Sequence, residues 1–359
     1  MAKKFIISEI FLLRSIACLA VVLLHSISRY KSYESLNSSS FVFWDSFELL
    51  LKFGTPTFIF ISELLIAKSY SESVPKGFLF KRFKLIMIPY LAMAVFYALY
   101  YSISDLKMFL PYAVENIFGG YHGYFVLIIF QFYLLHLFFI KYLKDSNPKV
   151  VLLVSLIINV AYLSIFNFIK PATDNDVIVY FWERGHWMPF TGWLFYFSLA
   201  FYAGRYYEKF KEFLLKYKKV LYCIPVFMGA VVVLLNYLNV FENTSKRIDM
   251  IFFTVSMIFV IYLIGMSIKE VPIILVKISQ YSFGIYLLHM FYQLMINRIV
   301  IYFDLNIGLF YLFTIFIGSI IASIISVYFL NKVPFGQYVA GKVGIGFRKQ
   351  ELSQTKKAV

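Results

Sequence analysis

The stretch ISEIFLLRSIACLAVVLLHSIS, residues 7–28, is long and apolar, yet it carries an arginine and a histidine. About 20 apolar residues are enough to cross a bilayer as a helix, so the stretch predicts a membrane-spanning helix from Phe5 to Ser28. Arg14 and His25 are eleven residues apart, close to three helical turns. We expect them on one side of the helix, about 16 Å apart along its axis.

A charged side chain inside a bilayer points to function. An arginine there costs roughly 2.5–3.5 kcal/mol on insertion scales, so it usually faces a protein interior or a water-filled cavity. The default interpretation of Arg14 is therefore a functional site. The alternative is an arginine that only pairs with a carboxylate such as Glu9 or Glu63.

The composition extends the membrane interpretation to the whole chain. Hydrophobic residues make up 61% of it, aromatic residues 21% and charged residues 15%, which leaves too little polar surface for a water-soluble domain. We predict an all-α polytopic integral membrane protein. Its ten expected spans are Phe5 to Ser28, Ser46 to Ala67, Leu85 to Ile103, Tyr124 to Tyr142, Val150 to Ile169, Phe190 to Gly204, Val220 to Val240, Asp249 to Ile268, Tyr281 to Ile301 and Asn306 to Leu330.

The distribution of basic residues predicts the orientation. If the amino terminus is cytoplasmic, two of the 34 basic residues, Arg14 and Lys52, lie within spans and 24 lie on the cytoplasmic side. The outer side then holds eight: Arg29, Lys31, Lys107, Lys170, Arg184, Lys246, Arg247 and Arg298. The positive-inside rule therefore predicts a multi-pass protein of the cell membrane with both termini in the cytoplasm. The formal charge of +15 indicates topology and contact with anionic membrane lipids, and we expect no nucleic-acid partner.

The chain is expected to form one transmembrane domain, residues 1–334, followed by a basic cytoplasmic tail, residues 335–359. Cys18 and Cys223 both fall inside predicted spans, so they indicate neither a disulfide framework nor a metal cluster. No metal is expected. The segment from Arg205 to Lys219 mixes basic and apolar residues at helical spacing and predicts an amphipathic helix at the inner membrane surface.

Polar residues in and near the spans are candidates for a ligand site. His122 and Gln131 are expected to line it, since intramembrane polar groups need partners. His289 is a further candidate, although a buried histidine is commonly satisfied by a neighbouring hydroxyl. The outer loop after Lys170 carries Trp182 and His186, and aromatic and polar side chains together suit a sugar. Aromatic residues are also common at any membrane interface, which leaves this loop open to both interpretations.

Five segments, in order, resemble one family. The Arg14 to His25 spacing is similar to the R-x10-H signature of the acyltransferase 3 family, integral membrane enzymes that acylate cell-surface glycans. The other four segments are FGTPTFIFIS (53–62), FKRFKLIMIPY (80–90), GYHGYFVLIIFQFYLL (120–135) and YSFGIYLLH (281–289). The resemblance covers residues 5–335. Glu63 departs from the family, which usually has glycine after the position of Ser62.

Several segments resemble most a subgroup of the family that is associated with poly-β-1,6-N-acetylglucosamine, a biofilm polysaccharide. That subgroup has been described both as a polymer exporter and as an O-succinyltransferase. Two functions therefore stay open: an O-acyltransferase that uses acyl-coenzyme A, with succinyl-CoA or acetyl-CoA as donor, and a polysaccharide exporter. The implied partners are an extracellular or nascent glycan and a polysaccharide synthase.

The resemblance implies roles for named residues. His25 would act as general base or nucleophile toward a sugar hydroxyl, and Arg14 would stabilise an oxyanion or bind the donor. The basic residues Lys81, Arg82 and Lys84 would bind the phosphates of coenzyme A on the cytoplasmic side. The expected substrate-binding residues are Glu63, His122, Tyr124, Gln131, Trp182, His186 and His289.

Overall fold

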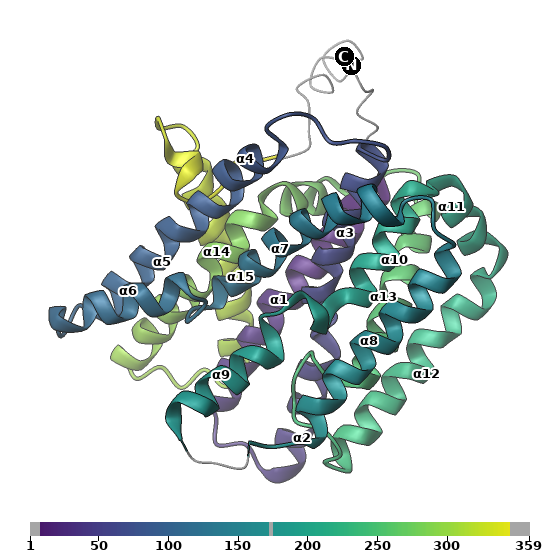
Figure 1. Cartoon of the computed structure of the whole chain (residues 1–359). Helices are drawn as coiled ribbons and strands as arrows, with labels where there is room; N and C mark the ends of the chain where they lie inside the picture. The colour runs from purple at the N-terminus through teal and green to yellow at the C-terminus, as the bar shows by residue number, and fades with distance from the viewer. Residues whose placement is uncertain (1–7, 172–174, 345–359) are drawn as a thin grey trace, which may run out of the picture.

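The structure, a computed structural model, describes residues 8–171 and 175–344. Over these residues the chain forms fifteen α-helices with short 3-10 and π segments and no strands, which confirms the predicted all-α class (Figure 1). The α-helices are α1 Ser8–Tyr33, α2 Ser38–Leu51, α3 Gly54–Ser69, α4 Phe78–Arg82, α5 Ile88–Tyr101, α6 Phe109–Ile117, α7 Phe125–Phe138, α8 Pro148–Phe168, α9 Asp176–Trp187, α10 Leu194–Arg205, α11 Tyr207–Lys216, α12 Lys218–Tyr237, α13 Ile248–Ser267, α14 Ile273–Tyr302 and α15 Phe310–Leu330.

Within the described residues, nine helical segments are long and apolar enough to cross a membrane. The expected span from Phe190 to Gly204 is not one of them. It forms a 3-10 turn, Phe190–Trp193, followed by α10, which has only 12 residues. Most of α10 is buried between α3 and α8, so its apolar character reflects burial inside the protein rather than contact with lipid.

Helix α1 lies at the centre of the bundle. It contacts α2, α3, α13, α14 and α15. Of its most apolar stretch of 18 residues, 72% is buried inside the protein, whereas the corresponding share is 17% for α8 and for α12 at the periphery. Burial of this kind permits a helix to carry Arg14 and His25, because neither side chain has to face lipid. The helix that bears the sequence signature is therefore enclosed by protein.

The predicted span Ser46 to Ala67 is two helices rather than one. Helix α2 ends at Leu51 and α3 begins at Gly54. A Cβ atom on Gly54 would lie 2.8 Å from the carbonyl oxygen of Ala17, so α3 approaches α1 at a distance that only glycine allows. The break also places Lys52 at the junction of the two helices.

The two ends of the bundle differ in what covers them (Figure 1). Helices α4 and α11 lie at the end where α1 begins, and α2 and α9 lie at the end where α1 finishes. Helix α11 forms within the predicted amphipathic segment and buries Tyr207, Phe210 and Leu214 on one side. Of the expected tail, residues 335–344 pack back near α5, with Ala340 buried; residues 345–359 and the outer-loop residues 172–174 lie outside the described residues.

Candidate functional site

Three histidines meet near the second half of α1. The ring centroids of His25 and His289 are 5.3 Å apart, and those of His122 and His289 are also 5.3 Å apart. The three come from α1, from α14 and from the 3-10 turn His122–Tyr124 that precedes α7. The structure therefore brings together three predicted site residues that lie far apart in the sequence.

Backbone carbonyls orient His289. Its Nδ1 atom lies 2.9 Å from the carbonyl oxygens of both Ile285 and Tyr286, so Nδ1 carries the proton and donates it. The Nε2 atom, which then has the free lone pair, is buried without a hydrogen-bond partner in the described part of the chain. The hydrogen-bond partners of His289 in the described chain are therefore backbone carbonyls and not a neighbouring hydroxyl. His289 therefore keeps an unprotonated Nε2 atom that can accept a hydrogen bond or a proton.

His122 is held by the same turn of α14. Its Nε2 atom lies 3.1 Å from the carbonyl oxygen of Tyr286, and the Tyr286 hydroxyl donates to the carbonyl oxygen of His122 at 2.6 Å. The Tyr97 ring lies edge-on to His122 with centroids 4.9 Å apart. Tyr97 also donates to the carbonyl oxygen of Leu287 at 3.1 Å, so α5 and α14 together fix the cluster.

Gln293 completes the cluster one turn further along α14, at i+4 from His289. Its Nε2 atom donates to Ser26 Oγ at 3.0 Å and to the carbonyl oxygen of Val22 at 3.2 Å, which ties α14 to α1 beside His25. The Gln293 Oε1 atom is buried and unpartnered within the described chain. Sequence reasoning missed Gln293, Tyr97 and Tyr286. The spacing of Gln293 from His289 was a signal that could have found the first.

A pocket of about 480 Å³ opens beside His25. Its polar lining comes from Ser28, Arg29 and Ser32 of α1, Asn297 of α14 and Tyr311 of α15, and its apolar lining comes from Met290, Ile301 and the ring of Tyr33. Along α1 in the other direction, Cys18 and Val22 are buried in an apolar cluster with Ile285. His25 therefore lies between a polar pocket and a packed apolar layer.

Arg14 belongs to a second cluster at the other end of α1. It lies close enough to the Tyr133 phenol for electrostatic interaction, and Tyr133 interacts in the same way with Arg82 and Glu63. Glu63 pairs with His136, with 2.6 Å between Glu63 Oε1 and His136 Nδ1. Both side chains are buried, and among the described residues the remaining Glu63 Oε2 and His136 Nε2 atoms have no partner. The carboxylate considered as a partner for Arg14 thus binds a histidine.

The three predicted donor-binding residues differ in how exposed their side chains are. Arg82 turns inward, with its guanidinium carbon 5.3 Å from the Phe78 ring centroid and 5.4 Å from that of Tyr133. Lys81 and Lys84 are exposed on α4 and on the π-helix Phe83–Met87. Short π segments inside helices are frequent at functional sites. Arg82 therefore connects this exposed basic end to the cluster around Arg14.

Two further candidates hold the outer loop in place. Gln131 donates from Nε2 to the carbonyl oxygen of Met188 at 3.0 Å and accepts from the Phe190 amide at 3.1 Å. The Tyr124 ring lies 4.3 Å from that of Trp187, centroid to centroid. Both residues position the turn that follows α9.

Trp182 and His186 pack against α8 rather than against the three histidines. The His186 ring stacks on Phe166 at 5.2 Å and the Trp182 ring lies 4.8 Å from the same phenylalanine. Burial lowers the pKa of His186, and the charge of Lys246 lowers it further. The structure therefore separates these two outer-loop candidates from His25.

Lys246, in the loop between α12 and α13, was not singled out by sequence reasoning. Only 6% of it is exposed, and its Nζ atom lies 5.1 Å from the Trp193 ring centroid and 5.6 Å from that of Tyr124. Burial lowers the pKa of Lys246 to about 7, and the nearby charge of Lys52 acts in the same direction.

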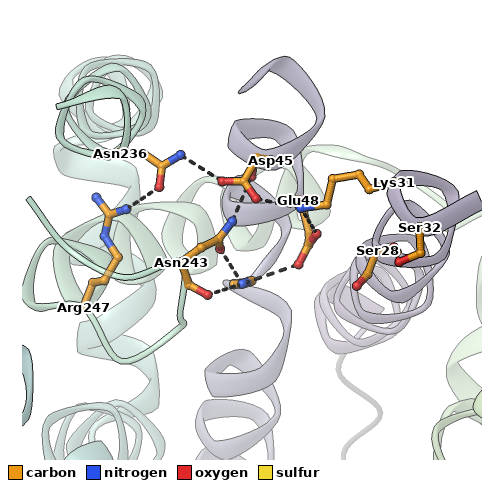
Figure 2. A network of polar contacts seen from close by, with 9 residues as sticks. Ser28, Lys31, Ser32, Asp45, Glu48, Asn236, Asn243 and Arg247 are labelled. Carbon is orange, nitrogen blue, oxygen red and sulfur yellow. Dashed lines mark hydrogen bonds and ion pairs between the residues drawn. The ribbon is translucent and has the colours of Figure 1, made fainter. Parts of the chain in front are cut away.

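A polar network fixes the loop that carries Lys246 (Figure 2). Lys31 of α1 binds Asp45 at 2.6 Å and Glu48 at 2.9 Å, both on α2. The other contacts join Lys52 to Asn243, Asn243 and Asn236 to Asp45, and Arg247 to Asn236 and Asp249. The network ties α1 and α2 to α12 and α13 at the end of the bundle where α1 finishes.

Comparison with known proteins finds a family match over most of the chain. Residues 7–329 match the family described as "Acyltransferase domain". "Putative membrane-bound acyltransferase YfiQ" of Bacillus subtilis is 39% identical over 350 residues, which cover 94% of this chain and 95% of the relative. No set of three or more histidine, cysteine, aspartate or glutamate side chains in the described residues could hold a metal ion.

Other relatives carry a different name. "Probable poly-beta-1,6-N-acetyl-D-glucosamine export protein" of Staphylococcus aureus strain Mu50 is 30% identical over 286 residues, covering 78% of this chain and 81% of the relative. The protein of that name from Staphylococcus epidermidis is 32% identical over 290 residues, with coverage of 78% and 79%. No solved structure matches the chain. The family match over nearly the whole chain, with the R-x10-H pair on its central helix, shows that the chain belongs to the acyltransferase 3 family of multi-pass membrane proteins.

Proposed function

We propose that the chain is an O-acyltransferase that moves an acyl group, succinyl or acetyl, from cytoplasmic acyl-coenzyme A to an extracellular polysaccharide. The observation that carries the proposal is the position of His25 between the oriented His289 and a polar pocket. A sugar hydroxyl in that pocket would meet a base, which is what transfer to oxygen requires.

The proposed transfer of the acyl group needs only the two substrates and His25. His25 accepts the proton of the sugar hydroxyl while the hydroxyl oxygen forms the new ester bond to the acyl carbon. The carbon–sulfur bond of the thioester breaks, and the protonated His25 returns its proton to the departing thiolate, so that coenzyme A leaves as the free thiol. His289 and His122 are positioning residues on this proposal, because backbone carbonyls fix the ring of His289 against His25 and the ring of His122 against His289.

Arg14 is proposed to act on the donor. Eleven residues along α1 correspond to about 16 Å, so Arg14 and His25 cannot both contact one reacting atom. Arg14 interacts with Tyr133, and Tyr133 lies beside Arg82, which leads to the exposed Lys81 and Lys84. We assign these basic residues to the coenzyme A phosphates and Arg14 to the inner part of the donor.

The remaining candidates are proposed to contribute less directly. Glu63 would support the donor side through His136, and Tyr124 and Gln131 would hold the outer loop near the acceptor. Trp182 and His186 would contact more distant parts of the glycan. Both termini are proposed to be cytoplasmic, which puts Lys81, Arg82 and Lys84 on the side of acyl-coenzyme A.

Polysaccharide export is the second candidate, and the names of the staphylococcal relatives favour it. The packed apolar layer around Cys18 and Val22 favours the enzyme, because it would have to part only for the narrow pantetheine arm that carries the acyl group and not for a polymer chain. A synthase that delivers the nascent glycan would be the partner in either case.

Reconstitution tests the proposal directly. Purified protein in liposomes would receive isotopically labelled succinyl-CoA or acetyl-CoA on one side and β-1,6-linked N-acetylglucosamine oligomers on the other. We expect labelled ester on the oligomer. Movement of unmodified oligomer across the membrane, without ester, would instead support the exporter.

A further inference from the structure

One face of α1 forms a wall of the pocket beside His25. His25, Ser28, Arg29 and Ser32 line it, at the i, i+3, i+4 and i+7 spacing that places side chains on a single helical stripe. Asn297 of α14 and Tyr311 of α15 line another part. The pocket is therefore built by three helices and includes the proposed catalytic base.

The side chain of Asn297 presents a donor to the pocket. The Tyr311 hydroxyl donates to Asn297 Oδ1 at 2.5 Å, which assigns the other end of the amide as the NH₂ group. The NH₂ group makes no hydrogen bond within the described part of the chain, so Asn297 retains its two N–H groups for a ligand. The Ser32 hydroxyl donates to the carbonyl oxygen of Ser28, so its proton is used within α1.

Arg29 supplies a positive charge without a carboxylate. None of the ion pairs formed by residues 8–171 and 175–344 includes Arg29. Its Nε atom is buried and has no hydrogen-bond partner among these residues. Arg29 is close enough to His25, His289 and Tyr311 to interact with each electrostatically. Its charge therefore acts at the centre of the site.

Two carboxylates near this end of α1 bind lysines, and a third, Glu34, forms no ion pair with Arg29 among the described residues. Asp45 and Glu48 both bind Lys31, two residues after Arg29, and Glu48 also lies 3.5 Å from Lys52 (Figure 2). Figure 2 shows Lys31 turned toward α2, with Ser28 and Ser32 beside it on α1. Within the described residues Arg29 therefore forms no ion pair, and the carboxylates of Asp45 and Glu48 are held by lysines.

A neutral sugar does not need such a cation. Hydroxyl groups are satisfied by paired donors and acceptors, whereas an arginine fork and an amide NH₂ group match the oxygens of a phosphate or a carboxylate. A deacetylated, cationic glucosamine would be repelled by Arg29. The donors in the pocket therefore select for an oxyanion.

We propose that the pocket binds an oxyanion, a phosphate or a carboxylate, on the acceptor glycan and that Arg29 and Asn297 are its specificity-determining residues. This proposal rests on the proposed acyltransferase function, because it treats the pocket as the acceptor site. Binding of the anion would place a neighbouring sugar hydroxyl beside His25.

Binding measurements in lipid nanodiscs test the site without requiring catalysis. The probes are a β-1,6-linked N-acetylglucosamine tetramer, the same tetramer with one phosphate monoester, and a deacetylated tetramer. For the wild-type protein we expect the phosphorylated probe to bind about tenfold or more tightly than the neutral one, and the deacetylated probe to bind most weakly. Equal affinities for the three probes would overturn the proposal.

Substitutions locate the effect. Arg29→Gln should abolish the preference for the phosphorylated tetramer, and Arg29→Lys should retain part of it, since lysine keeps the charge but lacks the fork. Arg298→Gln is the matched control, because Arg298 is exposed next to Asn297 but does not line the pocket. A preference that survives in both Arg29 variants, with thermal unfolding unchanged, would remove Arg29 from the site.

The oxyanion could also belong to the transferred acyl group. In that case Arg29→Gln would alter the discrimination between succinyl-CoA and acetyl-CoA and leave the preference among acceptors intact, which would overturn the assignment to the glycan. Failure of the general function has a different signature. Selective binding of the phosphorylated tetramer without ester formation would sink the acyltransferase while the site stands, and ester formation on all tetramers alike would sink only the oxyanion site.

Discussion

At the scale of single residues, His25 and Arg14 divide the protein into two chemical regions. His25 shares its surroundings with two other histidines and a polar pocket, and Arg14 shares its surroundings with Tyr133. Their spacing in the sequence predicted a common helix, but their neighbours depended on contacts with α3, α7 and α14. Those contacts are set by tertiary packing, which the spacing does not encode.

Substitution of His25 tests the acceptor side. His25→Ala should lower ester formation by about 10² or more, because general-base assistance is commonly worth 10²–10⁴ in rate. Arg14→Lys should also be severely impaired, since lysine keeps the charge and loses the planar guanidinium. Ester formation is measured in membranes with matched protein levels, alongside surface polymer. Normal ester formation by His25→Ala would exclude it from the mechanism.

The pair of Glu63 and His136 tests how much a buried ion pair contributes to stability. Glu63→Leu should lower the free energy of unfolding by about 1–3 kcal/mol, because it leaves His136 buried without its hydrogen-bond partner. The double variant with His136→Phe should recover part of the loss, since both polar groups are then gone.

Thermal unfolding of the purified variants measures the effect of Glu63. The matched control is Glu72→Gln, because Glu72 also pairs with cations, Lys144 and Arg205, but its side chain is 65% exposed. Exposed pairs contribute about 0–1 kcal/mol. Equal losses for Glu63→Leu and Glu72→Gln would contradict a structural role for the buried pair.

At the scale of helices and loops, hydrophobic runs predicted most spans but not where helices break. The run from Ser46 to Ala67 is largely apolar, yet it divides at Lys52 because Lys52 binds Asn243 and Gly54 packs on α1. The segment from Phe190 to Gly204 is apolar because it is buried between α3 and α8. Its packing on α3 is close, since a Cβ atom on Gly204 would lie 2.4 Å from the carbonyl oxygen of Leu64. Hydropathy alone does not separate burial in protein from burial in lipid.

The loop between α12 and α13 should make stability depend on pH through Lys246. Its pKa of about 7 in the folded state is below its ordinary value of 10.5. The unfolded state therefore binds more protons between about pH 7 and 10.5, so the contribution of Lys246 to stability rises with pH across this window.

Lys246→Met isolates that contribution. The variant should unfold at a higher temperature than the wild type at pH 6, where the wild type buries a charged lysine, and the difference should shrink toward pH 10. Lys342→Met, which changes an exposed lysine, serves as the control. A difference between Lys246→Met and wild type that stays constant from pH 6 to pH 10 would show that this lysine does not titrate in the folded protein.

At the scale of the whole molecule, the two ends of the bundle carry different chemistry. One end carries α4 and α11, and the other carries α2 and α9 (Figure 1). The basic residues near Arg82 belong to the first end, and the pocket beside His25 lies toward the second. A donor from the cytoplasm and an acceptor outside the cell would fit this separation. The bias of the basic residues predicts that the first end lies in the cytoplasm.

Cysteine labelling tests this orientation. In a background with Cys18→Ala and Cys223→Ala, single cysteines would replace Asp176, at the start of α9, and Lys342, near the short 3-10 helix Gly336–Tyr338; both positions are exposed. An impermeant maleimide added to intact cells should label Asp176→Cys alone, and Lys342→Cys should react only after permeabilisation. Labelling of both in detergent provides the control for reactivity. The reverse pattern would place the pocket beside His25 in the cytoplasm and would contradict an extracellular acceptor.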